Sequence, residues 1–485
     1  MTIRCFARRY LYCMKGTLIR SLLALGLTVQ GLNLLGKSNS PLVVHEWGTF
    51  TSLQDEAGQT IGGINTDDEP VPKFVHRLAD FLLLRPTEVP GIFFQGAPHC
   101  HPDVTLRLET PVLYFHLPQG RQTEEDLTVT ASFRGGWLSE FFPNANVSAP
   151  GLVSNTMTFG PLRSGIVSTL SWNHLDIGGN WPGPDTAQHV WTSPRAVQAA
   201  NIRTTGGEAE KFLFYRGVAH IDAPISVVQD EKNSTLVLRS QCASEVADQD
   251  PLKVNFLWLV DIAENGRVAF RQLPSVLLGG EAKTLATVSR HFGQTDYSDN
   301  SREQLKSALL SALVAEGLFN DEAQALLNTW ELSYFKSPGM RIFFMVPRKW
   351  TDYYLPLKIS RPAEVTRVMV GRIEVLTAWQ KNYLRQIAQA STNTIRADAI
   401  RLHNDFYARI GKKPNEMQQV DAGKESLDQF GISVPRTYQW YLALGRFRNA
   451  LVLEEARKHP STGLDAFIST YALQGYKPVE VSTRF

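Results

Sequence analysis

Between residues 41 and about 290, apolar and polar residues alternate in short runs, which is typical of β-strands with one buried face. The alternation is clear at residues 106–116, 127–133 and 254–262. Asn265 and Gly266 stand between two apolar runs and predict a tight hairpin. Many short strands without intervening helices favour a sandwich-like fold.

From about residue 300 the apolar residues recur every three or four positions, which predicts α-helices. Ser301 and Gln304 form a capping box at the start of one predicted helix, and Gly317 ends it. A second predicted helix begins at Asn320 and has Glu322 in its first turn.

The last third of the chain mixes both patterns. Strands are predicted at 340–346 and 367–375, and helices at 377–389, 394–410, 438–458 and 464–473. The chain is therefore predicted to be an α+β protein. We expect a β-rich, sandwich-like domain at 41–295, followed by a helix-rich α+β domain at 296–485.

Residues 1–40 have the composition of an export signal. A basic run without acidic residues leads into an apolar stretch at 21–36, which is shorter than the roughly 20 residues of a membrane span. We expect a signal peptide, with an uncleaved signal anchor as the alternative and as the one predicted contact with a membrane. The predicted location is outside the cytoplasm, in the periplasm, in the cell envelope or secreted.

The leader also determines the apparent charge. It carries six of the 49 Lys and Arg residues and no acid, so its removal leaves 43 basic and 47 acidic residues, and the net charge changes from +2 to −4. A nearly neutral chain lacks the basic surface of a nucleic-acid-binding protein. Residues 41–360 hold 25 basic and 35 acidic residues, whereas 361–485 hold 18 and 12. This asymmetry predicts that the two regions attract each other.

Two cysteines, Cys100 and Cys242, follow the leader. Export permits them to form a disulfide that would join the two ends of the β-rich region. The alternative is that both are free and buried, because cysteine also serves as a small hydrophobic residue.

Histidines offer the first candidate chemistry. His99 and His101 are two positions apart on an extended segment, so their imidazoles share a face and are able to bind zinc or a similar divalent metal. We assign His116 as a third ligand, although no spacing selects it over the other distant candidates, which are His174, His189, His220 and Asp222. The alternative is a solvated loop without a metal.

His45 and Glu46 also suggest metal or acid–base chemistry. Adjacent side chains on a strand point to opposite faces, so the two residues do not share a pocket. The sequence therefore favours a hydrogen-bonded His45 beside a buried Trp47.

Charged residues on otherwise apolar strands are the last candidate. Strict alternation places Arg107 and Glu109 on one face, and it places Arg216 among apolar residues of another strand. A buried Arg216 needs a carboxylate, and Glu46 and Glu109 are the expected partners. The structural interpretation is an ion pair between strands; the catalytic one is an acid at Glu109 with a substrate-binding Arg216.

Several motifs resemble those of uncharacterised exported bacterial proteins that share a V-H-E-W-G-T-F-T-S opening. That opening lies at 44–52, and similar motifs lie at 108–115, 211–217 and 367–374. The resemblance covers most of the chain after the leader. It implies export and a shared architecture, and it implies no catalytic residue.

These observations favour an exported protein with a binding or scaffolding role, whose ligand is a protein or a polysaccharide. The alternative is an extracytoplasmic hydrolase, metal-assisted or carboxylate-based, that acts on a polymer such as polysaccharide or peptide.

Overall fold

The computed structural model describes residues 41–66, 71–81, 93–94, 96–153, 158–247, 251–279, 283–410, 431–473 and 475–478. The predicted leader, residues 1–40, lies outside them. Helices make up 29% and strands 35% of the structure, so the protein belongs to the mixed α and β class.

One mixed sheet of 15 strands organises the molecule. Its main path runs through β13 (Ala209–Glu210), β12 (Ile202–Arg203), β11 (Val167–Gly178), β7 (Gly136–Phe142), β14 (Leu213–Ala219), β5 (Leu106–His116), β1 (Leu42–Gln54), β24 (Ala363–Val375), β22 (Gly339–Met345), β18 (Leu257–Ile262) and β19 (Val268–Leu273). The remaining strands of this sheet are β2 (His76–Arg77), β6 (Thr123–Arg134), β8 (Asn146–Ser148) and β23 (Leu357–Ile359).

Four smaller sheets accompany it. They consist of β15 (Ile225–Asp230), β16 (Thr235–Ser240) and β21 (Thr284–Ser289), and of the pairs β17 (Leu252–Val254) with β20 (Val276–Leu278), β9 (Leu152–Val153) with β10 (Thr158–Phe159), and β3 (Phe93–Phe94) with β4 (Ala97–Pro98). The predicted hairpin is confirmed, because Gly266 adopts a φ of 79° between the antiparallel strands β18 and β19.

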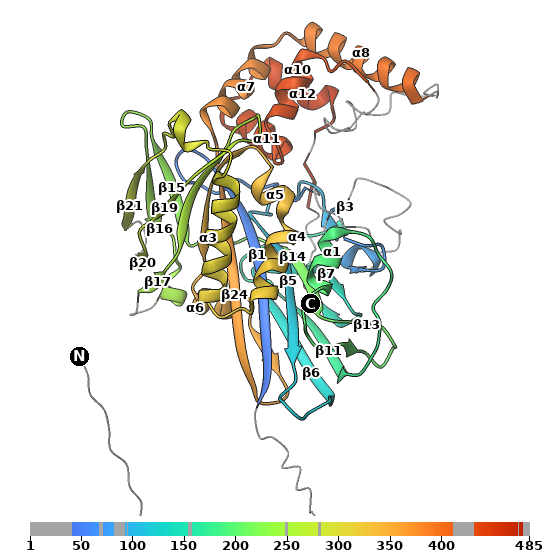
Figure 1. Cartoon of the computed structure of the whole chain (residues 1–485). Helices are drawn as coiled ribbons and strands as arrows, with labels where there is room; N and C mark the ends of the chain where they lie inside the picture. The colour runs from blue at the N-terminus through green and yellow to red at the C-terminus, as the bar shows by residue number, and fades with distance from the viewer. Residues whose placement is uncertain are drawn as a thin grey trace, which may run out of the picture.

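Strand β1 lies in the middle of the main sheet, antiparallel to β5 and parallel to β24 (Figure 1). Nearly all of its residues are buried, as expected for a strand covered on both faces. Strands β22 and β24 come from beyond residue 296 and pair within this same sheet. The two predicted regions therefore share one sheet.

The helices that precede the last region are η1 (Leu78–Phe81), α1 (His189–Arg195), α2 (Ser244–Ala247), η3 (Gln294–Asp296), α3 (Ser301–Ala315), α4 (Asn320–Thr329), α5 (Glu331–Phe335) and α6 (Arg348–Tyr354). The predicted helices beginning at Ser301 and Asn320 are thus confirmed. The predicted capping box of Ser301 and Gln304 is wrong, because the N-cap of α3 is Asn300, which makes no side-chain cap hydrogen bond. Helices α3, α4 and α5 cover the face of β1 that carries Trp47 (Figure 1). The opposite face carries Val44 and Phe50 and packs with residues of β15 and β16.

The C-terminal helices are α7 (Ala378–Gln389), α8 (Thr392–Ile410), α10 (Arg436–Ala443), α11 (Arg448–Lys458) and α12 (Thr462–Thr470). They gather beyond one end of the main sheet and form a third core with Leu53 of β1 (Figure 1). The single helix predicted at 438–458 is wrong. Gly445 adopts a φ of 84°, which ends α10 and allows the chain to turn into α11.

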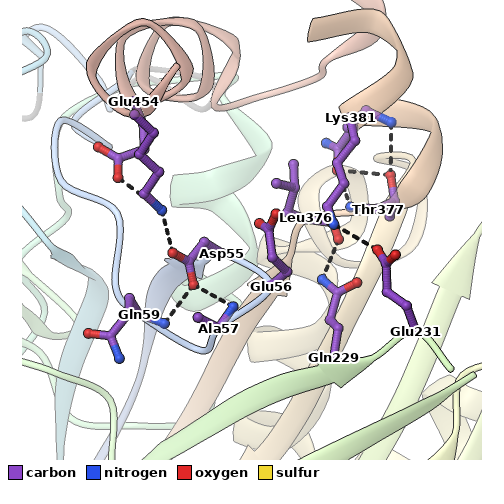
Figure 2. Close-up of polar contacts among 12 residues, drawn as sticks. Asp55, Glu56, Ala57, Gln59, Gln229, Glu231, Leu376, Thr377, Lys381 and Glu454 are labelled. Carbon is purple, nitrogen blue, oxygen red and sulfur yellow. Dashed lines mark hydrogen bonds and ion pairs between the residues drawn. The ribbon is translucent and has the colours of Figure 1, made fainter. Parts of the chain in front are cut away.

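Ion pairs join these helices to the acidic part of the chain. Lys381 of α7 lies 2.9 Å from Glu231 and 3.2 Å from Glu56 (Figure 2). Lys458 of α11 pairs with Asp55, whose carboxylate also accepts hydrogen bonds from the backbone of the following loop. The signs agree with the predicted attraction between the two regions.

Every helix in the described part of the chain is too short or too polar to cross a membrane.

Candidate metal centre

Strand register brings two histidines together at one end of β1. His116 lies opposite Val43, and Tyr114 lies opposite His45, so His45 and His116 are diagonal neighbours on one face. Their ring centroids are 5.3 Å apart.

Glu322 completes the cluster from the first turn of α4. Its Oε2 accepts a 2.8 Å hydrogen bond from the backbone N–H of Phe319, which caps the helix. Oε2 also accepts from His45 Nδ1 at 2.7 Å, and Oε1 accepts from His116 Nε2 at 2.8 Å. One buried carboxylate therefore holds both imidazoles.

The electrostatics keep Glu322 ionised. Burial alone would raise the pKa of this carboxyl group, but hydrogen bonds from His116 and His45 outweigh burial, and the pKa falls below its ordinary value. An ionised carboxylate beside two imidazoles is a ligand set suited to a divalent metal.

The three side chains also meet the distance requirement for a shared ion. One ligand atom from each of His45, His116 and Glu322 lies within 4.8 Å of the others. Two imidazoles and a glutamate are the donor set of many zinc sites with an open fourth position. Phe319 packs on both rings, at 4.5 and 4.9 Å, and is 48% exposed, so it is the outer cover of the cluster.

The predicted ligands His99 and His101 lie elsewhere. They precede β5, whereas His116 is the last residue of this strand, which is about 30 Å long. His101 is buried: its Nε2 bonds Gly160 O at 3.1 Å, and its Nδ1 accepts from Asp103 N at 3.2 Å. Burial lowers its pKa, which favours the neutral ring. The structure therefore does not bring His99 and His101 to His116, and both ring nitrogens of His101 already have backbone partners.

Cys100 and Cys242 do not form the disulfide that export would permit, and both are buried. Cys242 belongs to the core between the main sheet and β15 and β16, where burial raises its pKa to about 11. The Cys100 sulfur lies 3.3 Å from His99 Nε2 and 3.7 Å from Asn449 Nδ2. The two cysteines lie in different environments and support the alternative interpretation of small buried residues.

The predicted carboxylate partners of Arg216 are wrong. Arg216 pairs with Glu140, and both side chains are 2% exposed. Glu46 instead pairs with Arg367 and accepts a hydrogen bond from Tyr215. Sequence could not identify Glu140, because β7 and β14 become neighbours only in the sheet.

Glu109 is fully buried and pairs with Arg446, with Arg107 3.6 Å away. Burial alone would raise its pKa, but the surrounding guanidinium groups, that of Arg446 first, lower it below the ordinary value. Glu109 and Arg216 thus belong to separate ion pairs, both sealed in the fold, and the structural interpretation of each is favoured.

A backbone irregularity also changes which side chains accompany Glu109. Thr110 has a φ of 50°, and the pairing of β1 with β5 shifts between Trp47 and Thr49. Strict alternation would place Glu109 with Leu113, but the bulge moves it to the opposite face, beside Thr51.

Among the three residues, Glu322 had no sequence signal as a metal-binding residue, and the sequence placed it only in the first turn of a predicted helix. The sequence predicted that His45 and Glu46 point to opposite faces, and the structure confirms this.

Comparisons with known proteins do not identify the chain. No protein-family model and no curated protein matches it. Among solved structures, the yeast delta-COP-I mu-homology domain complexed with a Dsl1 WxWxV peptide aligns with 70% of this chain and 98% of its own, at 6% identity and a TM-score of 0.25. A TM-score this low carries no argument about fold or function.

Proposed function

We propose that the protein is an exported binding protein that holds a divalent metal ion, with zinc the best match, through His45, His116 and Glu322. The observation that carries this proposal is the meeting of three ligand atoms within 4.8 Å from two strands and one helix. These elements are far apart in sequence, so the ion would join α4 to the centre of the sheet.

Zinc binding requires His45 and His116 to lose the proton from the ring nitrogen that binds the metal. His45 Nδ1 and His116 Nε2 now donate to Glu322, and each ring has to present a lone pair to a metal instead. Metal binding should therefore release or relocate protons, as is usual for imidazole ligands.

Zinc titration calorimetry on metal-stripped protein tests the proposal. We expect one zinc per chain, and affinity at least 10-fold weaker in Glu322→Gln and His116→Ala. His174→Ala is the control, because His174 pairs with Asp126 on the surface and its side chain is 70% exposed. Unchanged affinity in both ligand variants would refute the site.

A polar groove of about 890 Å³ supports a binding role. Its lining carries both charge signs, including Arg239 and Asp222, and the guanidinium of Arg134 lies 5.3 Å from the ring centroid of Tyr353. Mixed charge, hydroxyl groups and aromatic rings suit a polysaccharide or peptide segment better than an apolar ligand.

A metal-assisted extracytoplasmic hydrolase is the second candidate. The observation in its favour is that two histidines and one glutamate leave a coordination position for water. A screen of polysaccharide and peptide substrates with zinc-loaded protein tests it, and Glu322→Gln should abolish any activity found. The carboxylate-based version has less support, because Glu109 and Arg216 are sealed from solvent.

Two finer proposals concern the leader and the architecture. Export by residues 1–40 is tested by cell fractionation and by sequencing the mature amino terminus. A sandwich-like unit at 41–295 is supported by the packing of β15 and β16 on one face of the main sheet. Because β22 and β24 complete that sheet, we expect the unit and the helix-rich region at 296–485 to unfold in one transition.

A further inference from the structure

A second buried polar cluster lies at the other end of β1, and it is rich in arginine. Arg372 of β24 and Arg341 of β22 are 1% and 0% exposed. Arg372 donates to Oε1 of Glu374, and Arg341 Nε lies 3.2 Å from the same oxygen. Two guanidinium groups thus share one carboxylate.

Other contacts do not balance this charge completely. Arg341 donates its hydrogen bonds to backbone carbonyls, which are neutral, at 2.7 Å to Ser337 and 3.0 Å to Ser333. Burial lowers the pKa of Arg341 to about 10, and repulsion from neighbouring guanidinium groups adds to this shift while Glu374 opposes it. Asp261 also attracts Arg341, while burial raises the pKa of Asp261 above its ordinary value.

Two buried donors in the cluster are unsatisfied. Nη1 of Arg372 and Nε of Arg341 have no hydrogen-bond partner in the part of the chain that the structure describes. A buried charged donor without a partner costs more than 1 to 3 kcal/mol, so such groups are rare unless a bound species completes them.

A small cavity adjoins this arginine. Its volume is about 20 Å³, and its polar lining residues are Arg372, Glu374, Gln380, Arg446 and Ser337. That volume accommodates one water molecule or one monatomic ion. Glu374 is already held by two guanidinium groups, so the field in the cavity favours an anion.

We propose that a monovalent inorganic anion, with chloride the match in charge and size, binds in this cavity beside Arg372. The site lies between the main sheet and the C-terminal helices, because its lining includes residues of β1 and β24 as well as residues of α7 and of the turn between α10 and α11. Gln380 of α7 also donates to Leu444 O in that turn, at 2.9 Å. The anion would therefore stabilise the contact between the C-terminal helices and the main sheet.

Crystals soaked in bromide test this proposal directly. We expect an anomalous peak within hydrogen-bonding distance of Arg372. Density that refines as water, without an anomalous peak, would overturn the assignment.

Thermal unfolding tests whether the anion contributes to stability. At constant ionic strength, replacing gluconate with chloride should raise the midpoint by about 2 °C or more and reach a plateau. Arg372→Met should lose this dependence, and Arg457→Met is the control because Arg457 forms a surface pair with Glu454. If Arg372→Met does not fold, the comparison of wild-type midpoints in chloride and gluconate still tests the proposal. Equal midpoints in both salts would mean that any bromide peak marks an adventitious ion, and this result would overturn the proposal.

Discussion

Strand β1 has one buried polar cluster near each end, and the two clusters contain different basic side chains. At one end, the carboxylate of Glu322 receives hydrogen bonds from His45 and His116. At the other, Arg341 and Arg372 share Glu374. From the register of β1 with β24, the clusters are about 20 Å apart along the same face of the sheet.

The difference shows how the type of basic side chain determines which ion a buried cluster can bind. Imidazole can become neutral and offer a lone pair, so the histidine cluster is able to exist without an ion and to accept a cation. Guanidinium stays charged over the physiological range and only donates, so the arginine cluster requires negative charge. The two sites should therefore respond to opposite ions.

The largest expected effect is at the arginine end. Glu109→Gln should lower the free energy of unfolding at pH 7 by about 3 to 5 kcal/mol, because it leaves Arg446 without its buried carboxylate. The folded pKa of Glu109 is lowered, so its contribution is complete above the unfolded pKa, near 4.3, and is lost as the pH falls through the folded value. Urea unfolding between pH 7 and pH 3 measures this difference, with Glu303→Gln as a surface control. A penalty that persists unchanged in acid would contradict the ion-pair explanation.

A second prediction is that zinc stabilises the protein through the histidine cluster of β1 and not through the arginine cluster. Zinc at about 100 times its dissociation constant should stabilise the wild type by about 2.7 kcal/mol, and Glu322→Gln should remove that gain. His99→Ala should retain it, since His99 lies apart from the cluster. Denaturant titrations with and without zinc measure the gain. If His99→Ala lost the zinc effect and Glu322→Gln kept it, the metal would bind at His99 and not at Glu322.

A smaller effect is expected at Phe319, which covers the histidines. Phe319→Ala should speed zinc release to a chelator and change the free energy of unfolding by about 1 kcal/mol or less, because the ring is half exposed. Stopped-flow exchange with a chromogenic chelator measures the rate. An unchanged rate would show that zinc leaves by another path.

The smallest effect concerns the ion pairs of Lys381 shown in Figure 2. Lys381→Met should cost about 0.2 to 1 kcal/mol and become neutral at high salt, because its pairs with Glu56 and Glu231 are partly exposed. Unfolding at two salt concentrations measures the change. A larger, salt-independent loss would indicate that packing of the lysine stem matters more than its charge.

Much of the local structure was predictable because it depends on nearby residues. The helices α3 and α4 follow from apolar spacing, and the turn at Gly266 follows from the Asn–Gly pair. The boundary between α10 and α11 was missed, because a glycine within an apolar helical pattern does not reveal that it will adopt a positive φ.

The candidate site was only partly predictable. His45 and His116 were both candidate histidines, but no spacing joined them to each other or to Glu322, which lies 277 positions from His45. Alternation also failed at Glu109, where the bulge at Thr110 reversed the face.

Sequence by itself determined the mixed α and β composition, the helix starts, the separation of His45 from Glu46, and the charge asymmetry that the surface ion pairs reflect. Only the tertiary structure decided that β24 lies beside β1, that Glu322 joins His45 and His116, and that Arg341 and Arg372 share Glu374. The physical reason is range: capping and periodicity act within a few residues, whereas strand register and helix packing select partners hundreds of positions apart.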